Sequence, residues 1–157
     1  RGVADVFARH ARKEIPGDYE GALRRLSFLP FEGFLRGFID LVCEHDGRFY
    51  VIDYKSNFLG PLPGDYAESA LLKAMAEHHY FLQYHLYTVA VHRYLARRVE
   101  RYDYDRCFGG VFYLFLRGMA PDRGMTGVFA DRPPRALIEA LSSLFDGGRG
   151  VTEKRAR

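Results

Sequence analysis

Residues 37–57 read GFIDLVCEHDGRFYVIDYKSN, and this stretch decides the fold. Two apolar, β-rich runs, residues 37–43 and 49–55, flank a short polar segment that contains Asp46 and Gly47. Asp-Gly between such runs is a strong signal for a two-residue hairpin turn. The sequence therefore predicts an antiparallel hairpin whose register is fixed by Asp46 and Gly47.

This register has a chemical consequence at the open end of the hairpin. With a two-residue turn, Asp40 lies directly opposite Asp53. Facing carboxylates, with Cβ atoms about 4.5–5.5 Å apart, repel each other. A divalent cation held by oxygen ligands is the simplest group that relieves the repulsion. Lys55 follows Asp53 by two residues and therefore lies on the same face of the strand.

A simpler interpretation is that Lys55 only neutralises Asp53 as an ion pair. Both faces of the two strands are largely apolar, so we expect the acids to lie in a central, covered sheet. Charges without solvent are costly there. This cost favours a functional role for the pair over a surface ion pair.

The composition limits the number of domains, the partners and the kinds of metal site. The 157 residues, of which 48% are hydrophobic, suffice for one domain with a real core. A net charge of +3 is compatible with a nucleic-acid partner without requiring one. Two cysteines, Cys43 and Cys107, are too few for a four-cysteine zinc or iron–sulfur site, and we expect buried free thiols.

Hydrophobic periodicity and turn residues predict the other elements. Helices are expected at residues 3–13, 66–99 (with a break at His78-His79) and 135–145, and strands at residues 25–29, 108–116 and 127–130. We expect a single domain over residues 1–146 and a disordered tail over 147–157. This order describes an α/β fold in which helices flank a central mixed β-sheet.

The second half of the long helical region carries one polar residue on an apolar stripe. Tyr80, Gln83 and Tyr87 share this stripe by the i, i+3/i+4, i+7 rule. An inward amide such as that of Gln83 must find hydrogen-bond partners. Three histidines of the same helix, His78, His85 and His92, are seven residues apart, which is about 10.5 Å and too far for them to share one ion.

Asp40, Asp53 and Lys55 together fit metal-assisted phosphodiester hydrolysis. In that chemistry carboxylates bind the ion, the ion polarises a phosphate oxygen and activates water, and a lysine stabilises the developing charge. Magnesium suits such a site because it prefers hard oxygen ligands.

Three segments resemble the successive motifs of the PD-(D/E)XK nuclease superfamily. They are residues 37–40 (GFID), 51–57 (VIDYKSN) and 83–87 (QYHLY). Residues 82–95 and 102–118 extend the likeness to the C-terminal nuclease domains of the RecB family, whose members are beta subunits of exonuclease V (RecBCD). The resemblance covers roughly residues 34–145. It implies a restriction-endonuclease-like central mixed β-sheet flanked by α-helices.

The resemblance also implies roles for individual residues. Asp40 and Asp53 would bind one or two Mg²⁺ ions together with the backbone carbonyl of Tyr54, and Lys55 would be the catalytic lysine. Gln83 and Tyr87 match the family's Gln-xxx-Tyr helix motif, which supports the active site and the DNA strand. The motif would explain why a polar amide, that of Gln83, lies on the inward apolar stripe.

Two departures from the family pattern stand out. The family's Pro-Asp is Ile39-Asp40 here. RecB-type sites also use a histidine well upstream as a metal ligand, and His10 lies too close to Asp40 to fill that position. Since the chain starts at Arg1 without a methionine, we expect an N-terminally truncated fragment of a larger helicase-nuclease, with weak metal binding and poor cleavage on its own.

For the parent protein, the resemblance implies a cytoplasmic exodeoxyribonuclease V-type enzyme. An ATP-dependent helicase would feed single-stranded DNA ends to the nuclease, with RecC- and RecD-like partner subunits, in double-strand-break repair and recombination. No membrane segment is apparent. Two alternatives remain open, a non-catalytic nuclease-fold module that grips DNA or a partner subunit, and a free-standing RecB-like endonuclease.

Residues outside the motifs are candidates for DNA contacts. Basic side chains bind phosphates, and the candidates are Arg36, Arg48, Lys73 and Arg117. Aromatic side chains stack on bases in single-strand channels, and the candidates are Tyr54, Phe58 and Tyr84.

Overall fold

The computed structural model describes residues 2–10, 15, 19–25 and 37–146. The chain divides into two compact units. One comprises residues 1–36 and 134–157, and the other comprises Gly37–Pro133. The predicted tail at 147–157 lies outside the described residues.

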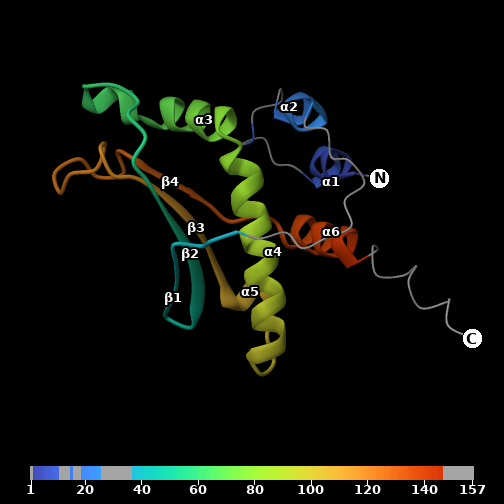
Figure 1. Cartoon of the computed structure of the whole chain (residues 1–157). Coiled ribbons are helices and arrows are strands. Elements are labelled where there is room, and N and C mark those ends of the chain that lie inside the picture. The colour runs from blue at the N-terminus through green and yellow to red at the C-terminus, as the bar shows by residue number, and fades with distance from the viewer. Residues whose placement is uncertain (1, 11–14, 16–18, 26–36, 147–157) are drawn as a thin grey trace, which may run out of the picture. The chain divides into compact units, whose positions relative to one another are not determined.

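The larger unit is built on a four-stranded sheet in the order β1-β2-β3-β4 (Figure 1). The strands are β1 (Leu41–His45), β2 (Arg48–Lys55), β3 (Phe108–Phe115) and β4 (Val128–Asp131). β1 and β4 pair antiparallel with their neighbours, whereas β2 and β3 are parallel. The sheet is therefore mixed, as the sequence predicts.

The hairpin has the predicted register. Val42 is paired with Val51 and His45 with Arg48, around a turn in which Asp46 and Gly47 both have positive φ. Positive φ at both central positions is the geometry that favours Asp-Gly in a two-residue hairpin. The ladder ends at the Leu41–Ile52 pair, so Asp40 lies one residue beyond the last paired position.

The prediction that both hairpin strands are covered is wrong for β1. β1 is an edge strand, and the side chains of Leu41 and Val42 are 38% and 42% exposed. β2 lies between β1 and β3, and its Val51 is fully buried. Only the second acid, Asp53, thus belongs to a central strand.

A helical crossover joins the parallel strands β2 and β3. It consists of the 3-10 turn η1 (Pro63–Tyr66) and the helices α3 (Glu68–Glu77), α4 (Tyr80–Arg98) and α5 (Tyr104–Cys107). The predicted break at His78-His79 is confirmed, because His79 has φ of 55° and separates α3 from α4. α4 contacts β2 and β3, and α3 contacts β4 (Figure 1).

Aromatic and aliphatic side chains from α4 and β3 form the core of this unit. Phe81 and Tyr84 of α4 and Phe108, Val111 and Phe115 of β3 are at most 1% exposed. Cys43 and Cys107 are free thiols, as expected, but both are only partly buried. The crossover therefore attaches α4 firmly to the sheet face that carries Asp53 and Lys55.

The smaller unit contains α1 (Val3–His10), α2 (Tyr19–Arg25) and α6 (Arg135–Asp146). α1 contacts both of the other helices, and Phe7, Leu23 and Leu141 are buried. The strand predicted at 25–29 is wrong at Arg25, which ends α2, and its other residues lie outside the described part. No helix in the described ranges has the length and hydropathy needed to cross a bilayer.

Candidate active site

Asp53 and Lys55 lie two residues apart at the C-terminal end of β2. Both side chains are buried on one face, 5% and 10% exposed, while Tyr54 between them is 46% exposed on the other. The Lys55 ammonium forms an ion pair with Asp53 Oδ1. The period-2 geometry of the strand thus delivers both charged groups to the same covered face.

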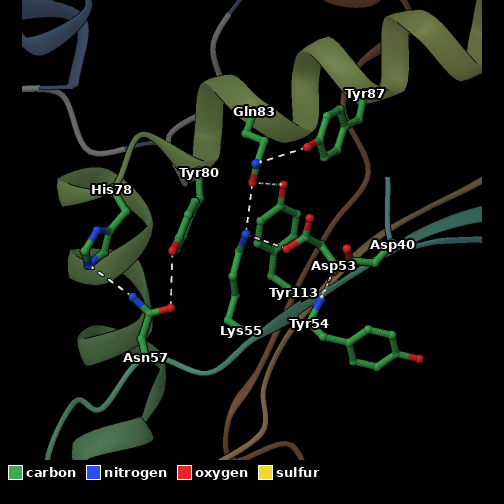
Figure 2. A network of polar contacts seen from close by, with 10 residues as sticks. All are labelled: Asp40, Asp53, Tyr54, Lys55, Asn57, His78, Tyr80, Gln83, Tyr87 and Tyr113. Atoms are coloured by element: carbon green, nitrogen blue, oxygen red, sulfur yellow. Dashed lines mark hydrogen bonds and ion pairs between the residues drawn. The ribbon is translucent and has the colours of Figure 1, made fainter. Parts of the chain in front are cut away.

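Asp40 joins this pair from the start of the hairpin. Its Oδ2 accepts a hydrogen bond of 2.9 Å from the backbone N–H of Tyr54. The bond places the Asp40 carboxylate beside the peptide unit that links Asp53 to Tyr54 (Figure 2). The two acids and the lysine of the sequence hypothesis are therefore brought together.

Burial and a like charge act on the Asp53 carboxyl. Burial is the largest effect and raises its pKa above the ordinary value, and the negative charge of Asp40 raises the pKa further. The hydrogen bond and charge of Lys55 lower the pKa without cancelling the rise. The folded protein thus disfavours the charged form of Asp53, as expected of a carboxylate that binds a cation.

Gln83 holds Lys55 from the facing helix α4. Its Oε1 accepts hydrogen bonds of 3.0 Å from Lys55 Nζ and 2.9 Å from the Tyr113 hydroxyl. Its Nε2 donates to the Tyr87 hydroxyl at 3.1 Å (Figure 2). The predicted inward amide therefore has its partners, and one of them is the buried ammonium.

Two aromatic rings complete the surroundings of Lys55. The ammonium lies 3.9 Å from the ring centroid of Tyr80 and 4.8 Å from that of Tyr113. Such rings attract a cation through their negative faces, most strongly when the cation is desolvated. Tyr80 and Tyr113 thus compensate part of the cost of burying Lys55.

Asn57 connects the end of β2 to the junction of α3 and α4. Its Oδ1 accepts a hydrogen bond of 3.2 Å from the Tyr80 hydroxyl, and its Nδ2 lies 3.2 Å from His78 Nε2. The His78 ring also stacks on Tyr80. Tyr80 is therefore held from two sides against Lys55.

Tyr87 links α4 to the residues just before Asp40. A Cβ added to Gly37 would come within 3.1 Å of the Tyr87 ring, so the glycine permits a close approach. Burial raises the pKa of the Tyr87 hydroxyl, and the charges of Asp53 and Asp40 raise it further. The hydroxyl therefore stays protonated and remains a hydrogen-bond donor.

Not every candidate from the sequence belongs to this cluster. Tyr84 is fully buried, and its hydroxyl donates to Asp131 at 2.8 Å, so the prediction that it stacks on bases is wrong. His78, His85 and His92 have separate partners, Asn57, the Phe81 carbonyl and the Tyr102 hydroxyl. His10 lies on α1 in the other unit.

The candidates for DNA contacts also differ in exposure and in their protein partners. Phe58 and Tyr54 are exposed, as stacking requires. Arg48 is exposed at the hairpin turn, and Arg117 donates to the Ser56 carbonyl at 2.9 Å. Lys73 lies 3.8 Å from Glu77 on α3, and Arg36 lies outside the described residues.

The site roles of three residues were not predicted from the sequence: Tyr80, Tyr113 and Asn57. Tyr80 precedes Gln83 by three residues and shares its stripe, which is a usable signal. Tyr113 is hidden in the apolar run of β3 and reaches the site because it pairs with Asp53 in the parallel ladder. That pairing has no local signal.

The donor set fits Mg²⁺ chemistry. Asp40 and Asp53 supply carboxylates, and a third oxygen, the Tyr54 carbonyl, belongs to the residue whose backbone N–H donates to Asp40. Hard oxygen ligands with room for retained waters are what Mg²⁺ prefers. Within the described residues no group of three or more His, Cys, Asp or Glu side chains could hold a metal ion.

Comparisons with known proteins agree with this geometry. The model of the PD-(D/E)XK nuclease superfamily matches residues 1–152. The RecBCD enzyme subunit RecB of Escherichia coli K12 is 48% identical over 122 residues, and that of Haemophilus influenzae is 53% identical over 120. These matches cover 78% and 76% of the chain and 10% of each relative.

A third relative extends the likeness towards the chain ends. RecB of Mycobacterium tuberculosis H37Rv is 44% identical over 161 residues, which cover 94% of the chain and 14% of that protein. The chain thus spans about a tenth of the length of the curated relatives it matches.

Proposed function

Because the chain belongs to the PD-(D/E)XK nuclease superfamily, we propose that it is a magnesium-dependent DNA nuclease domain that hydrolyses phosphodiester bonds. The observation that carries the proposal is the convergence of Asp40, Asp53 and Lys55 at the end of β2, with Gln83 bonded to the lysine. The raised pKa of Asp53 supports it, since a buried acid opposed by its surroundings is a mark of a functional site.

In this proposal, Asp40, Asp53 and the Tyr54 carbonyl hold the metal. When bound, Mg²⁺ supplies positive charge at the scissile phosphate and lowers the pKa of a coordinated water. Asp40 also contributes by its bond to the Tyr54 N–H, which keeps the two halves of the hairpin in contact at this point. The proposed metal ligands are thereby pre-organised at the open end of the hairpin, where Asp40 is bonded to β2.

Lys55 supplies a fixed positive charge beside the metal ligands. An ammonium has three N–H donors. Among the described residues, Asp53 and Gln83 accept two of them, which leaves one for a phosphate oxygen or the attacking water. Gln83 and the rings of Tyr80 and Tyr113 orient the ammonium so that its charge is in place before the reaction.

The wider setting is also a proposal. The relatives are named as a subunit of the RecBCD enzyme. We propose that the chain works as the exodeoxyribonuclease V-type nuclease part of a longer cytoplasmic protein, with an ATP-dependent helicase and RecC- and RecD-like partners. Its substrate would then be single strands from unwound DNA ends, in double-strand-break repair.

The test is cleavage of end-labelled single-stranded DNA by the chain in Mg²⁺ or Mn²⁺. We expect Asp53→Ala and Lys55→Met to reduce cleavage at least a hundredfold, because each removes a charge of the catalytic cluster. Arg97→Met and Glu44→Gln are matched controls on exposed positions of α4 and β1, and should cleave as the wild type does.

Two results would count against the proposal. Undiminished cleavage by Asp53→Ala or Lys55→Met would exclude these residues from the chemistry. A wild-type chain that binds DNA without cutting it in either metal would instead support a non-catalytic module.

A further inference from the structure

A cavity of about 290 Å³ is formed by residues that follow the ends of β2 and β3. Its walls come from the loops that follow β2 and β3, and they include Phe58, Leu62, Tyr66, Arg117 and Arg123. We propose that this cavity is a subsite for one nucleotide of a single DNA strand, with the base on Phe58 and the phosphate on the two arginines. The inference rests on the proposed nuclease function and names how the substrate strand is held.

The position of the cavity follows from the parallel pairing of β2 and β3. Both strands end at the same edge, and Leu116 extends the pairing by donating to the Lys55 carbonyl at 3.0 Å. In open α/β sheets this carboxyl-end edge is where ligands bind. The cavity therefore opens at the end of the sheet that carries Lys55.

Phe58 of the cavity is also close in sequence to Lys55 of the candidate active site. Phe58 follows Lys55 by three residues, which span at most about 11 Å. Stacked nucleotides rise about 3.4 Å each, so Phe58 is no more than about three nucleotides from the candidate catalytic group. A strand held here would pass beside Lys55.

The chemistry of the lining suits a nucleotide. Phe58 and Leu62 are 67% and 64% exposed and offer apolar surface for a base. Both charged lining residues, Arg117 and Arg123, are basic, and phosphate contacts supply much of nucleic-acid affinity. The volume is near the lower limit of about 300 Å³ for ligand pockets, which favours one nucleotide over a base pair.

The two arginines contribute in different ways. Arg117 Nε donates to the Ser56 carbonyl at 2.9 Å, and its guanidinium lies 6.0 Å from the centroid of the Phe58 ring. This leaves its terminal nitrogens for phosphate, in a fixed position. Arg123 is exposed, and its side chain forms no hydrogen bond or ion pair with any residue that the structure describes.

Tyr66 makes the cavity a preformed feature. Its ring is buried, and its hydroxyl accepts a bond of 3.2 Å from the Leu59 N–H and donates to the Asn57 carbonyl at 3.4 Å. Its carbonyl accepts a bond of 3.1 Å from the Gly127 N–H. One residue thus ties together the two loops that form the walls, so binding does not have to order them.

The experiment measures binding separately from cleavage. The chain is titrated into a fluorescently labelled 12-nucleotide oligo(dT) in EDTA, and the anisotropy gives the Kd. We expect Phe58→Ala and Arg123→Ala to weaken binding at least fivefold. Phe58→Tyr, which keeps a ring, and Arg97→Ala, which removes an exposed charge at the end of α4, should stay within twofold of the wild type.

Two further measurements identify the contacts of Arg123 and Phe58 with DNA. Arg123→Ala should lower the slope of log Kd against log salt concentration by about 0.7, the value for one phosphate contact on a single strand. Phe58→Ala should bind a 12-base-pair duplex within twofold of the wild type, because bases inside a duplex are already stacked on their neighbours and do not enter a subsite for one nucleotide. An equal loss on duplex and single strand would overturn the assignment of Phe58 as a base platform.

Failure of this inference is distinguishable from failure of the nuclease proposal. Wild-type affinity of Phe58→Ala and Arg123→Ala for oligo(dT) would overturn the subsite, whether or not the chain cuts DNA. Absence of cleavage by the wild type in metal would overturn the nuclease function and leave the binding result standing. Arg123 is exposed, so its variant tests the subsite even where Phe58→Ala does not fold.

Discussion

Asp53 is the residue at which the proposed function has a cost in stability, because a charged carboxylate is buried there. Its carboxyl is buried next to Asp40, and its pKa is raised despite the adjacent Lys55. A raised pKa in an acid means that the folded protein disfavours the charged form, so the penalty is present above that pKa and disappears on acidification through it. A cation at the site would remove the same penalty.

This raised pKa predicts a pH-dependent metal affinity. Metal binding needs the carboxylate, so binding of Mn²⁺ should release a proton from Asp53 and weaken as the pH falls from neutral towards the raised pKa. The weakening should begin at a higher pH than for an ordinary aspartate. Calorimetric titrations in two buffers of different ionisation enthalpy measure the released proton. Affinity that stays constant with pH over this range would contradict the prediction.

Tyr80 is the second residue with a specific consequence. Its ring lies 3.9 Å from the Lys55 ammonium, a contact worth about 2 kcal/mol when desolvated. Tyr80→Leu should therefore lower kcat for cleavage roughly tenfold or more, with oligo(dT) affinity unchanged. Tyr80→Phe keeps the ring, loses only the bond to Asn57, and should retain most of the activity. Equal losses in both variants would show that the hydroxyl matters and the ring does not.

The β1–β2 hairpin is the element on which the site depends. Its turn sets the register, and the register places Asp40 beside the Asp53–Tyr54 peptide. Gly47 has φ of +71° in this turn, and a Cβ there would meet no atom within 4 Å. The need for glycine is therefore conformational and not steric.

A matched pair of glycine substitutions tests this point. Gly47→Ala should destabilise the fold by about 1–2 kcal/mol, the cost of a left-handed conformation for a residue with a side chain. Gly64→Ala is the control, because that site also has open space but lacks the left-handed φ, and its stability should be unchanged or slightly higher. Urea unfolding of both variants gives the comparison, and equal stabilities would refute the turn argument.

At the scale of the whole molecule, every residue of the candidate site belongs to the unit Gly37–Pro133. The crossover helices bring Gln83 of α4 onto the end of β2, so the site exists only when the hairpin, the crossover and β3 are assembled. Ligand binding to such a site stabilises the folded state against the unfolded chain.

Metal should therefore raise the melting temperature of the chain. At about 100 times the Kd, binding adds about 2.7 kcal/mol, which corresponds to a Tm increase of several degrees for a chain of this size. Asp40→Asn should abolish the increase in Mn²⁺ or Mg²⁺, whereas Glu44→Gln, which changes an exposed acid of β1 outside the ligand set, should retain it. A wild-type increase in the Asp40→Asn variant would remove Asp40 from the ligand set.

Features that depend on neighbours along the chain can be predicted from local sequence patterns. Asp-Gly fixed the turn and the hairpin register, because positive φ at two successive positions admits few residue types. Helical periodicity put Gln83 on the inward stripe, and the length of the periodic region led to the expected break at His78-His79. These signals lie within a few residues of the structure they specify.

Features that join distant segments depend on how the elements pack, and no local pattern predicts them. The parallel register of β2 and β3 puts Tyr113 opposite Asp53, and it follows from the packing of a crossover of some fifty residues, for which no short pattern exists. The exposure of β1 and the burial of Tyr84 likewise depend on which elements cover them. The cavity at Phe58 and Arg117 arises because two parallel strands end side by side, and that arrangement is fixed by summed packing over the whole sheet.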